Sequence, residues 1–145
     1  MLQTTGAKVV GPADGKSGSL GVIGVRFMID GDETEGRLSL VEHPMPPRAL
    51  AAPLHRHLRE DEYSYVLEGK VGALLGDEVV IAGPGDLLFK PRNQWHTFWN
   101  AGDEPARILD IISPSGFERY GLEMQPDTIP VLVERFGLRA PGDTA

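Results

Sequence analysis

Short apolar runs separated by turn-forming residues recur along most of this sequence. The runs are rich in β-branched and aromatic side chains and close on Gly, Pro or Asp, which is typical of β-strands joined by tight turns. No long helical pattern lies between them, as a parallel sheet would require. The pattern therefore predicts an all-β antiparallel sandwich or barrel. The expected strands span residues 20–30, 37–42, 62–68, 71–75, 78–81, 87–90, 96–100 and 106–112.

The hydrophobic period changes beyond Pro114. Ser115 and Glu118 fit the S-x-x-E pattern of a capping box, in which side chains satisfy backbone N–H groups at the start of a helix. Farther along, apolar residues recur at the spacing of one helical face, and Gly137 is a typical helix stop. We expect short helices that cover the barrel, with Phe117, Tyr120 and Met124 on one face and Ile129, Leu132, Val133 and Phe136 on another.

A chain of 145 residues is the size of a single domain that can bury a core. Residues 1–19 contain many Gly, Ser and Asp residues and few side chains that could pack, so we expect a flexible N-terminal arm there. The β-barrel is predicted over residues 20–114, and a C-terminal helical segment that packs on it over residues 115–139.

Acidic residues outnumber basic ones by 21 to 14, which gives a net charge of −7. This balance argues against nucleic acid and anionic membrane surfaces as partners, because both attract basic proteins. The sequence contains no Cys, which excludes disulfides and thiolate sites. It shows neither the apolar region of a signal peptide nor a run long enough to span a bilayer. We therefore expect a cytoplasmic protein.

Two of the four histidines lie one residue apart at the start of the stretch HRHLREDE. Side chains at i and i+2 of a strand share a face, so His55 and His57 project together, either as metal ligands or as a polar strand face. Glu62 lies five residues beyond His57, and an unbroken strand would send it to the opposite face. The segment between them must therefore turn or bulge if Glu62 is to meet the histidines. Glu60 and Asp61 are then expected on an exposed rim, with Asp61 as a rival ligand.

A third histidine, His96, opens the predicted strand 96–100 and follows a proline turn that could direct it inward. Asn93 lies in that turn, at a position where positive φ is expected, and Asn tolerates this conformation better than most residues. Taken alone, such a histidine is more often a hydrogen-bonded core residue than a metal ligand.

Taken together, these segments resemble the two motifs of the cupin family. HRHLREDEYSYVLEG, at residues 55–69, resembles the pattern H-x-H-x4-E-x6-G at every signature position. GDLLFKPRNQWHTFWN, at residues 85–100, resembles G-x5-P-x-G-x2-H-x3-N. Two positions depart from the family pattern. Ala49 replaces a glycine that often precedes the first motif, Asn93 replaces the internal glycine of the second, and neither change removes a ligand.

The resemblance, to small quercetin-dioxygenase-like cupins in particular, implies a jelly-roll β-barrel. It also implies one divalent transition metal held by His55, His57, Glu62 and His96. Imidazole and carboxylate donors suit Fe, Mn, Ni, Cu, Co or Zn, and the donor set does not choose among them. An octahedral ion would keep two positions for water, substrate or dioxygen. A homodimer is a further expectation from the resemblance.

Strand parity extends the candidate site. Phe98 shares a face with His96, while Ser64 and Val66 share a face with Glu62, so we expect these three residues in a substrate pocket. Trp95 and Trp99 face away from that pocket, toward a second packing layer or a subunit contact. We also expect core positions for Tyr63, Tyr65 and Leu67, a surface position for His43, and inward positions for Arg37 and Ser39.

These features support three hypotheses about function, and fold alone does not choose among them. The first is a metal-dependent, dioxygenase-like oxidoreductase that acts on a small organic molecule, with Glu62 as ligand and catalytic base. The second is a redox-neutral isomerase or epimerase. The third is a cupin that binds a metal or metabolite without turnover. Whether the protein is an enzyme stays open at this level, and the dioxygenase is the first choice.

Overall fold

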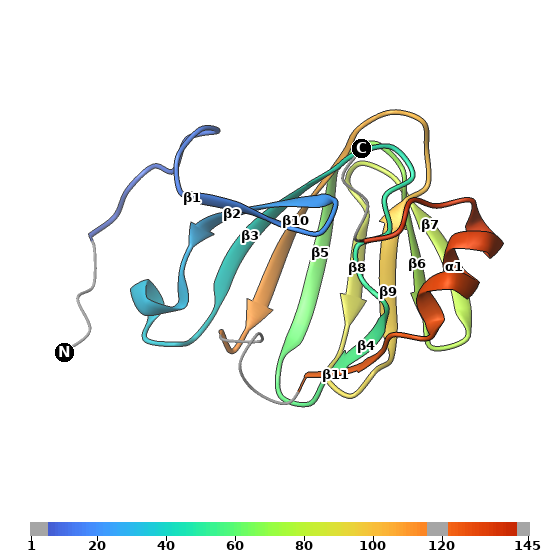
Figure 1. The fold of residues 1–145 in the computed structure, drawn as a ribbon. Helices are drawn as coiled ribbons and strands as arrows, with labels where there is room; N and C mark the ends of the chain where they lie inside the picture. The colour runs from blue at the N-terminus through green and yellow to red at the C-terminus, as the bar shows by residue number, and fades with distance from the viewer. Residues whose placement is uncertain (1–5, 116–121, 142–145) are drawn as a thin grey trace.

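The computed structural model describes residues 6–115 and 122–141. Their strands form two antiparallel sheets, shown in Figure 1. The six-stranded sheet has the order β1 (Lys16–Leu20), β2 (Ile23–Ile29), β3 (Ser39–Met45), β10 (Ala106–Ser113), β5 (Asp61–Glu68) and β8 (Leu87–Lys90). The five-stranded sheet has the order β11 (Leu122–Gln125), β4 (Leu54–His57), β9 (His96–Asn100), β6 (Val71–Leu75) and β7 (Glu78–Ala82). A short 3₁₀-helix, η1 (Gly31–Thr34), connects β2 to β3.

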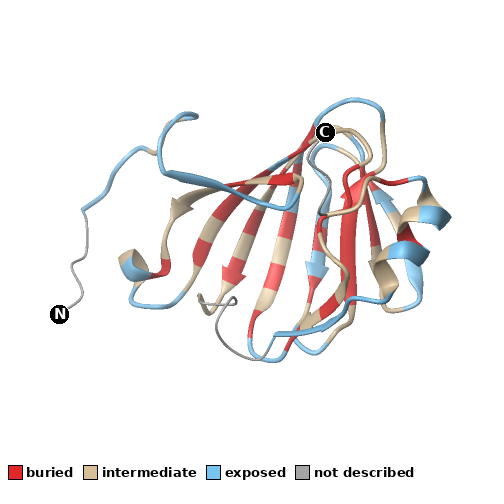
Figure 2. Cartoon of the chain, viewed as in Figure 1, coloured by how far each residue is buried: buried red, intermediate tan, exposed pale blue. Residues whose placement is uncertain are grey.

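The space between the two sheets holds the main core. Strand β10 alternates buried and half-buried residues along its whole length, as Figure 2 shows, so one of its faces meets the other sheet. Burying each large aliphatic side chain contributes on the order of 1.5–3 kcal/mol, which holds the sheets face to face. This core includes Ile23, Met45, Val66, Val71, Leu88, Phe98 and Ile108.

Each predicted strand is found. The strands at 71–75, 87–90 and 96–100 have the predicted ends, and the ends of the others are shifted. The predicted strand 20–30 contains a two-residue turn, because Gly21 adopts φ 59° and the chain folds back to pair β1 with β2. β1 therefore begins inside the expected N-terminal arm, and its residues are exposed. The described strand pairings do not join the two sheets, so the predicted barrel is described as two packed sheets. The division at residues 1–19, 20–114 and 115–139 stays a prediction.

The C-terminal part of the described chain contains a single α-helix, α1 (Thr128–Phe136), where several short helices were expected. It ends at Gly137, which adopts φ 64° as the predicted stop. The proposed capping box extends to Glu118, which with Phe117 and Tyr120 lies outside the described residues. Met124 was expected on a helix but lies in β11. Within the described ranges, no helix has the length and apolar character needed to cross a bilayer.

Helix α1 covers the outer face of the five-stranded sheet (Figure 1). Leu132 is buried there against Trp99, whose ring stacks on Phe136 with centroids 4.4 Å apart. Trp99 thus packs away from the candidate site, as its parity predicts. Trp95 is half-buried, with the Arg56 guanidinium 4.8 Å from its ring.

The outer face of β5 has no such cover among the described residues. Tyr65 and Leu67 are 41% and 36% exposed, and Tyr63 is half-buried, so the predicted core positions were wrong for all three. The three side chains do share one face of β5, as their parity predicts, but that face would be buried only beneath a second packing layer. Arg37 and Ser39 were expected to face inward from the predicted strand 37–42. Ser39 is buried, whereas Arg37 is exposed.

Candidate metal centre

Strand β4 presents two histidines to the space between the sheets. His55 and His57 are both buried, while Leu54 and Arg56 alternate with them and are half-buried. β4 pairs with β9 through His55 and His96, so the third histidine lies directly across the ladder. The i, i+2 spacing therefore places the imidazoles of β4 on one face, as the sequence predicts.

A turn separates β4 from β5 and reverses the parity of the chain. β4 ends at His57 and β5 begins at Asp61, so Glu62 faces inward and is 5% exposed. Asp61 is half-buried, and its carboxylate accepts a hydrogen bond from the Arg92 N–H. This hydrogen bond engages the Asp61 carboxylate, and Asp61 does not belong to the cluster formed by the histidines and Glu62.

Glu60 departs from its predicted place on an exposed rim. It is only 1% exposed, and neither carboxylate oxygen has a hydrogen-bond partner among the described residues. Burial raises the pKa of Glu60, and it outweighs the opposing influence of His57. The turn packs more tightly than its charged sequence indicated.

A backbone hydrogen bond connects the turn before β9 to the end of β4, and so joins the two motifs. Asn93 adopts φ 69°, the left-handed conformation expected for it, and its N–H donates to the His57 carbonyl over 2.7 Å. Two ring nitrogens in the cluster also face backbone carbonyls. His55 Nδ1 lies 2.8 Å from the Pro53 oxygen, and His96 Nδ1 lies 2.9 Å from the Gln94 oxygen. Donation from Nδ1 leaves Nε2 of each ring as the atom that can bind a metal.

The four predicted ligands converge. One potential ligand atom from each of His55, His57, Glu62 and His96 lies within 4.8 Å of the other three, and all four residues are buried. Glu62 Oε1 lies 2.5 Å from His57 Nε2 and 3.6 Å from His96 Nε2. An ion about 2.1 Å from each donor joins ligands up to about 4.2 Å apart, so a small adjustment would admit one.

Protonation favours metal binding at this site. Burial, together with the nearby His96, lowers the pKa of His55 to about 3, so this imidazole is neutral at pH 7. Burial alone would raise the pKa of Glu62, but the Lys90 charge and the hydrogen bond from His57 bring it well below its usual range. Metal ligands must be deprotonated, and both groups meet that requirement. The donor set and its protonation therefore fit a divalent metal.

Lys90 is a member of the site that the sequence reasoning missed. Its side chain is fully buried, with Nζ 3.6 Å from Glu62 Oε2 and 4.7 Å from the centre of the Phe98 ring. A signal was present, because Lys90 shares an inward face with Leu88 in β8. From the sequence alone, Lys90 is only the last residue of the predicted strand 87–90, before Pro91.

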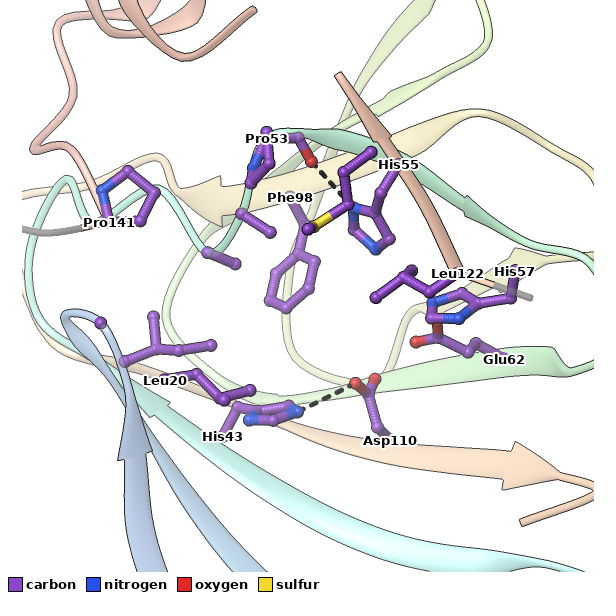
Figure 3. Close-up of a pocket in the computed structure, with 15 residues that line it drawn as sticks. Leu20, His43, Pro53, His55, His57, Glu62, Phe98, Asp110, Leu122 and Pro141 are labelled. Atoms are coloured by element: carbon purple, nitrogen blue, oxygen red, sulfur yellow. Dashed lines mark hydrogen bonds and ion pairs between the residues drawn. The ribbon is translucent and has the colours of Figure 1, made fainter. Parts of the chain in front are cut away.

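A cavity of about 340 Å³ opens beside the cluster, and most of its lining is apolar. Figure 3 shows His55, His57 and Glu62 at one side of it, with Phe98 in the wall. Ser64 and Val66 share the inward face of β5 but are not among the lining residues. Val66 is buried in the main core, and Ser64 donates a hydrogen bond to Asp110.

His43 lines this cavity as well, although a surface position was expected. It is 4% exposed, its Nδ1 lies 3.0 Å from the Gly24 oxygen, and its Nε2 lies 3.2 Å from Asp110 Oδ2. The physical reason is the length of β3, which continues through Pro44 to Met45. Alternation carried past residue 42 would have placed His43 on the same face as Ser39 and Val41.

A protein-family model described as "Cupin domain" matches residues 41–112, about half of the chain. Two curated relatives match shorter segments. One is the tetracenomycin polyketide synthase protein TcmJ from Streptomyces glaucescens, 37% identical over 60 residues, or 41% of this chain and 40% of the relative. The other is the oxidoreductase iacF from Pestalotiopsis fici, 39% identical over 61 residues, or 41% of this chain and 28% of the relative. The matches thus span less than half the length of either relative.

A solved structure matches over a longer part of the chain. The polyketide cyclase RemF from Streptomyces resistomycificus is 30% identical, with a TM-score of 0.67. The match covers 81% of this chain and 84% of RemF. The likeness therefore extends over most of both chains.

Proposed function

This chain belongs to the cupin superfamily, and from that premise we propose that it is a metal-dependent enzyme that cyclises or isomerises an apolar, ketone-bearing molecule without net oxidation. The observation that carries the proposal is the convergence of four metal-binding side chains at one side of a largely apolar cavity. A cavity of about 340 Å³ has the size of a small-molecule site.

The chain's own residues have distinct roles in this proposal. His55, His57, Glu62 and His96 would hold one divalent transition metal. When bound, such an ion acts as a Lewis acid that stabilises negative charge on a carbonyl oxygen. Glu62 remains ionised and is the candidate base for a proton on the carbon beside that carbonyl. Phe98 and the other apolar walls would exclude water and orient a hydrophobic substrate.

The comparisons favour this reaction class over the dioxygenase that the sequence put first. RemF is named a polyketide cyclase, and TcmJ is named a polyketide synthase protein. Polyketides carry several ketones on a largely carbon skeleton, which suits an apolar cavity with a Lewis-acid site at one side. RemF carries more weight than TcmJ, because the match covers most of its length.

A dioxygenase remains the second candidate. The match to the oxidoreductase iacF favours it, although that match spans only 28% of the relative. The same four ligands would serve either chemistry, because an octahedral ion keeps positions for a substrate oxygen and for dioxygen. The two candidates differ in their need for oxygen.

Metal analysis and anoxic turnover test the proposal. We expect freshly purified protein to contain about one transition-metal ion per chain, and His57→Ala to lose most of it, because the variant lacks one ligand. The metal-loaded wild type is then incubated with an aryl β-triketone, whose ring closure with loss of water gives an aromatic diol.

Product formed equally with and without oxygen supports cyclisation. Product that requires oxygen and consumes it supports the dioxygenase. Isomerised triketone without ring closure indicates the isomerase. Tight binding of metal and triketone without any product supports a non-catalytic cupin, and equal metal content in wild type and His57→Ala contradicts the site.

The cytoplasmic location stays a prediction. We also propose that the protein forms a homodimer. The outer faces of β5 and β8 carry exposed apolar side chains in cross-strand register, with Tyr65 opposite Leu87 and Tyr63 stacked on Phe89. Phe89 and Leu87 are 49% and 55% exposed. Light scattering should give twice the chain mass of 15.7 kDa, and Phe89→Lys should lower it if this face is buried in the dimer. A wild-type mass of one chain would contradict the dimer.

A further inference from the structure

Buried polar side chains cross the inner face of the six-stranded sheet. His43 comes from β3, Asp110 from β10, Ser64 from β5 and Lys90 from β8, and each is 4% exposed or less. The ladder pairs Asp110 with Ser64 and Lys90 with Glu62. Burying polar groups is costly unless they are partnered. Packing therefore does not explain their concentration beside the candidate metal centre.

His43 is held between two hydrogen-bond acceptors. Its Nδ1 faces the Gly24 carbonyl at 3.0 Å, and its Nε2 faces the Asp110 carboxylate at 3.2 Å. Two acceptors are best satisfied by a ring that carries a proton on each nitrogen, which is the imidazolium form. The other oxygen of Asp110 accepts a hydrogen bond from the Ser64 hydroxyl, which fixes the carboxylate.

The His43–Asp110 pair also faces the cavity. Five residues with polar side chains line it, namely the predicted ligands His55, His57 and Glu62, together with His43 and Asp110. Figure 3 shows the pair at the lower wall and the ligands at the right. A molecule in the cavity would therefore meet the candidate ligands on one side and His43 on the other.

We propose that His43 is a catalytic general acid of this enzyme and that Asp110 is the positioning residue that holds it charged. The inference rests on the proposed function and assigns the proton donor for it. The separation of 3.2 Å between Nε2 and Oδ2 is long for a charge-assisted hydrogen bond, which is typically about 2.7–2.9 Å. Because His43 and Asp110 both line the cavity, a substrate oxygen there would compete with Asp110 for the Nε2 proton.

The proton transfer balances without an oxidant. Glu62 removes a proton from the terminal methyl carbon of the triketone, and the electron pair of that C–H bond forms a new C–C bond to the carbonyl carbon that bears the aryl group, which closes a six-membered ring. The π pair of that carbonyl moves to its oxygen. The Nε2–H bond of His43 breaks at the same time, and its proton passes to that oxygen to give an alcohol. His43 becomes neutral and regains a proton from Glu62 through solvent. A second donation from His43 protonates the hydroxyl, which leaves as water. Glu62 removes a proton from the adjacent carbon, and the electron pair of that C–H bond forms the C=C bond. Enolisation of the two remaining ketones then gives the aromatic diol.

The charges around His43 agree with this role. Burial lowers the pKa of His43, but the hydrogen bond and charge of Asp110 raise it above its usual value overall. Burial raises the pKa of Asp110, and the charges of Lys90 and His43 bring it below its usual range. The charged groups that face the pair are Lys90 from β8 and Glu62 from β5. Lys90 opposes protonation of His43 and Asp110 favours it.

The first test measures the imidazole itself. Histidine-labelled, zinc-loaded protein is titrated by proton–nitrogen NMR, and His43→Gln identifies the His43 signals. We expect both nitrogens of His43 to be protonated at pH 7, with a pKa above that of an ordinary histidine. Asp110→Asn should lower this pKa. A neutral His43 at pH 7, or a pKa unchanged in Asp110→Asn, overturns the proposal.

The second test measures turnover of the aryl β-triketone by protein of equal zinc content. His43→Gln should bind zinc and triketone within about threefold of wild type but form product about 10²–10⁴ times more slowly. The wild-type rate should fall as pH rises through the pKa of His43, and Asp110→Asn should move that fall to lower pH. A His43→Gln variant that matches wild-type turnover overturns the assignment.

The two proposals fail in different ways. If wild-type protein binds no metal or never transforms the triketone, the proposed function fails, and the role of His43 fails with it. If wild type forms product and His43→Gln does so equally fast, only the assignment of the general acid fails. The NMR titration stands apart from turnover and decides the charge state of His43 in either case.

Discussion

Asn93 has a left-handed backbone conformation, with φ 69°, in the turn that leads to His96. Its N–H donates to the His57 carbonyl over 2.7 Å, so this conformation connects two of the candidate ligands. Asn93→Ala should cost about 1 kcal/mol of unfolding free energy, because a Cβ without a polar partner disfavours positive φ by about 1–2 kcal/mol. Urea unfolding measures the difference.

The matched variant is Asn93→Gly, which restores the residue that the cupin motif has at this position. Glycine adopts positive φ without a steric penalty, so its stability should stay within about 0.5 kcal/mol of wild type. If Asn93→Ala were as stable as Asn93→Gly, the left-handed conformation would not be what selects the residue here.

At the scale of single residues, parity and motif spacing placed the four candidate ligands and the turn at Asn93. Other residues could not be placed in this way, because their surroundings come from strands distant in sequence. His43 is buried through Gly24 and Asp110, which contribute from β2 and β10. Lys90 is buried beside Glu62, its partner across the ladder. Local sequence does not show which partner a strand will choose.

At the scale of elements, α1 packs on the side of the five-stranded sheet that faces away from the site. Leu132 is 4% exposed in the contact with Trp99. Leu132→Ala should therefore destabilise the fold by about 2–4 kcal/mol, through lost burial and a residual cavity. Metal content should stay at the wild-type level in folded protein. Urea unfolding and metal analysis measure the two effects.

Val131 provides the control on the same helix, because it is 63% exposed. Val131→Ala should change stability by no more than about 0.5 kcal/mol. Equal losses in the two variants would indicate that burial of Leu132 against the sheet is not what makes α1 stabilising, because Ala has a higher helix propensity than either replaced residue.

Glu42 connects three strands of the six-stranded sheet. Its carboxylate accepts hydrogen bonds from Arg26 in β2, at 3.2 Å, and from Arg107 in β10, at 2.7 Å. Burial raises the pKa of Glu42, but these two guanidinium groups outweigh burial and bring it below 4.5. A folded pKa below the unfolded pKa adds stability above pH 4.5, and this stability is lost as pH falls through the folded pKa.

Glu42→Gln should therefore cost about 1–3 kcal/mol at pH 7 and progressively less below pH 4.5. Urea unfolding at several pH values measures this difference from wild type. Glu68→Gln is the control, because the Glu68 side chain is 52% exposed although it also contacts Arg107. Its effect should stay below about 1 kcal/mol at every pH. A cost for Glu42→Gln that does not shrink in acid would contradict the ionic explanation.

The strands were predictable where each apolar run was bounded by Gly, Pro or Asp. β11, which pairs with β4, was not, because its four residues are all exposed and its sequence has no buried face that would mark a strand. The exposure of the outward face of β5 was not predictable for a related reason. Tyr63 and Tyr65 suit a strand, but their sequence does not reveal whether another layer covers them.

At the scale of the whole molecule, the candidate ligands come from both sheets. His55, His57 and His96 belong to β4 and β9 of the five-stranded sheet, and Glu62 belongs to β5 of the six-stranded sheet. An ion bound by all four would cross-link the two sheets. Because the unfolded chain lacks this arrangement, metal binding should stabilise the folded state.

Adding a divalent metal to chelator-treated wild type at 100 times its dissociation constant should therefore stabilise the fold by about 2.7 kcal/mol. Thermal unfolding should show this as a rise of roughly 5–10 °C in Tm. At the same metal concentration, a 100-fold weaker site in His57→Ala would retain only about 0.4 kcal/mol.

Glu68→Gln, outside the cluster, should keep the full shift. Glu62→Gln leaves the three histidines of one sheet, so it should bind metal more weakly and keep only part of the shift. An equal rise in wild type and His57→Ala would mean that the ion binds elsewhere and does not join the sheets.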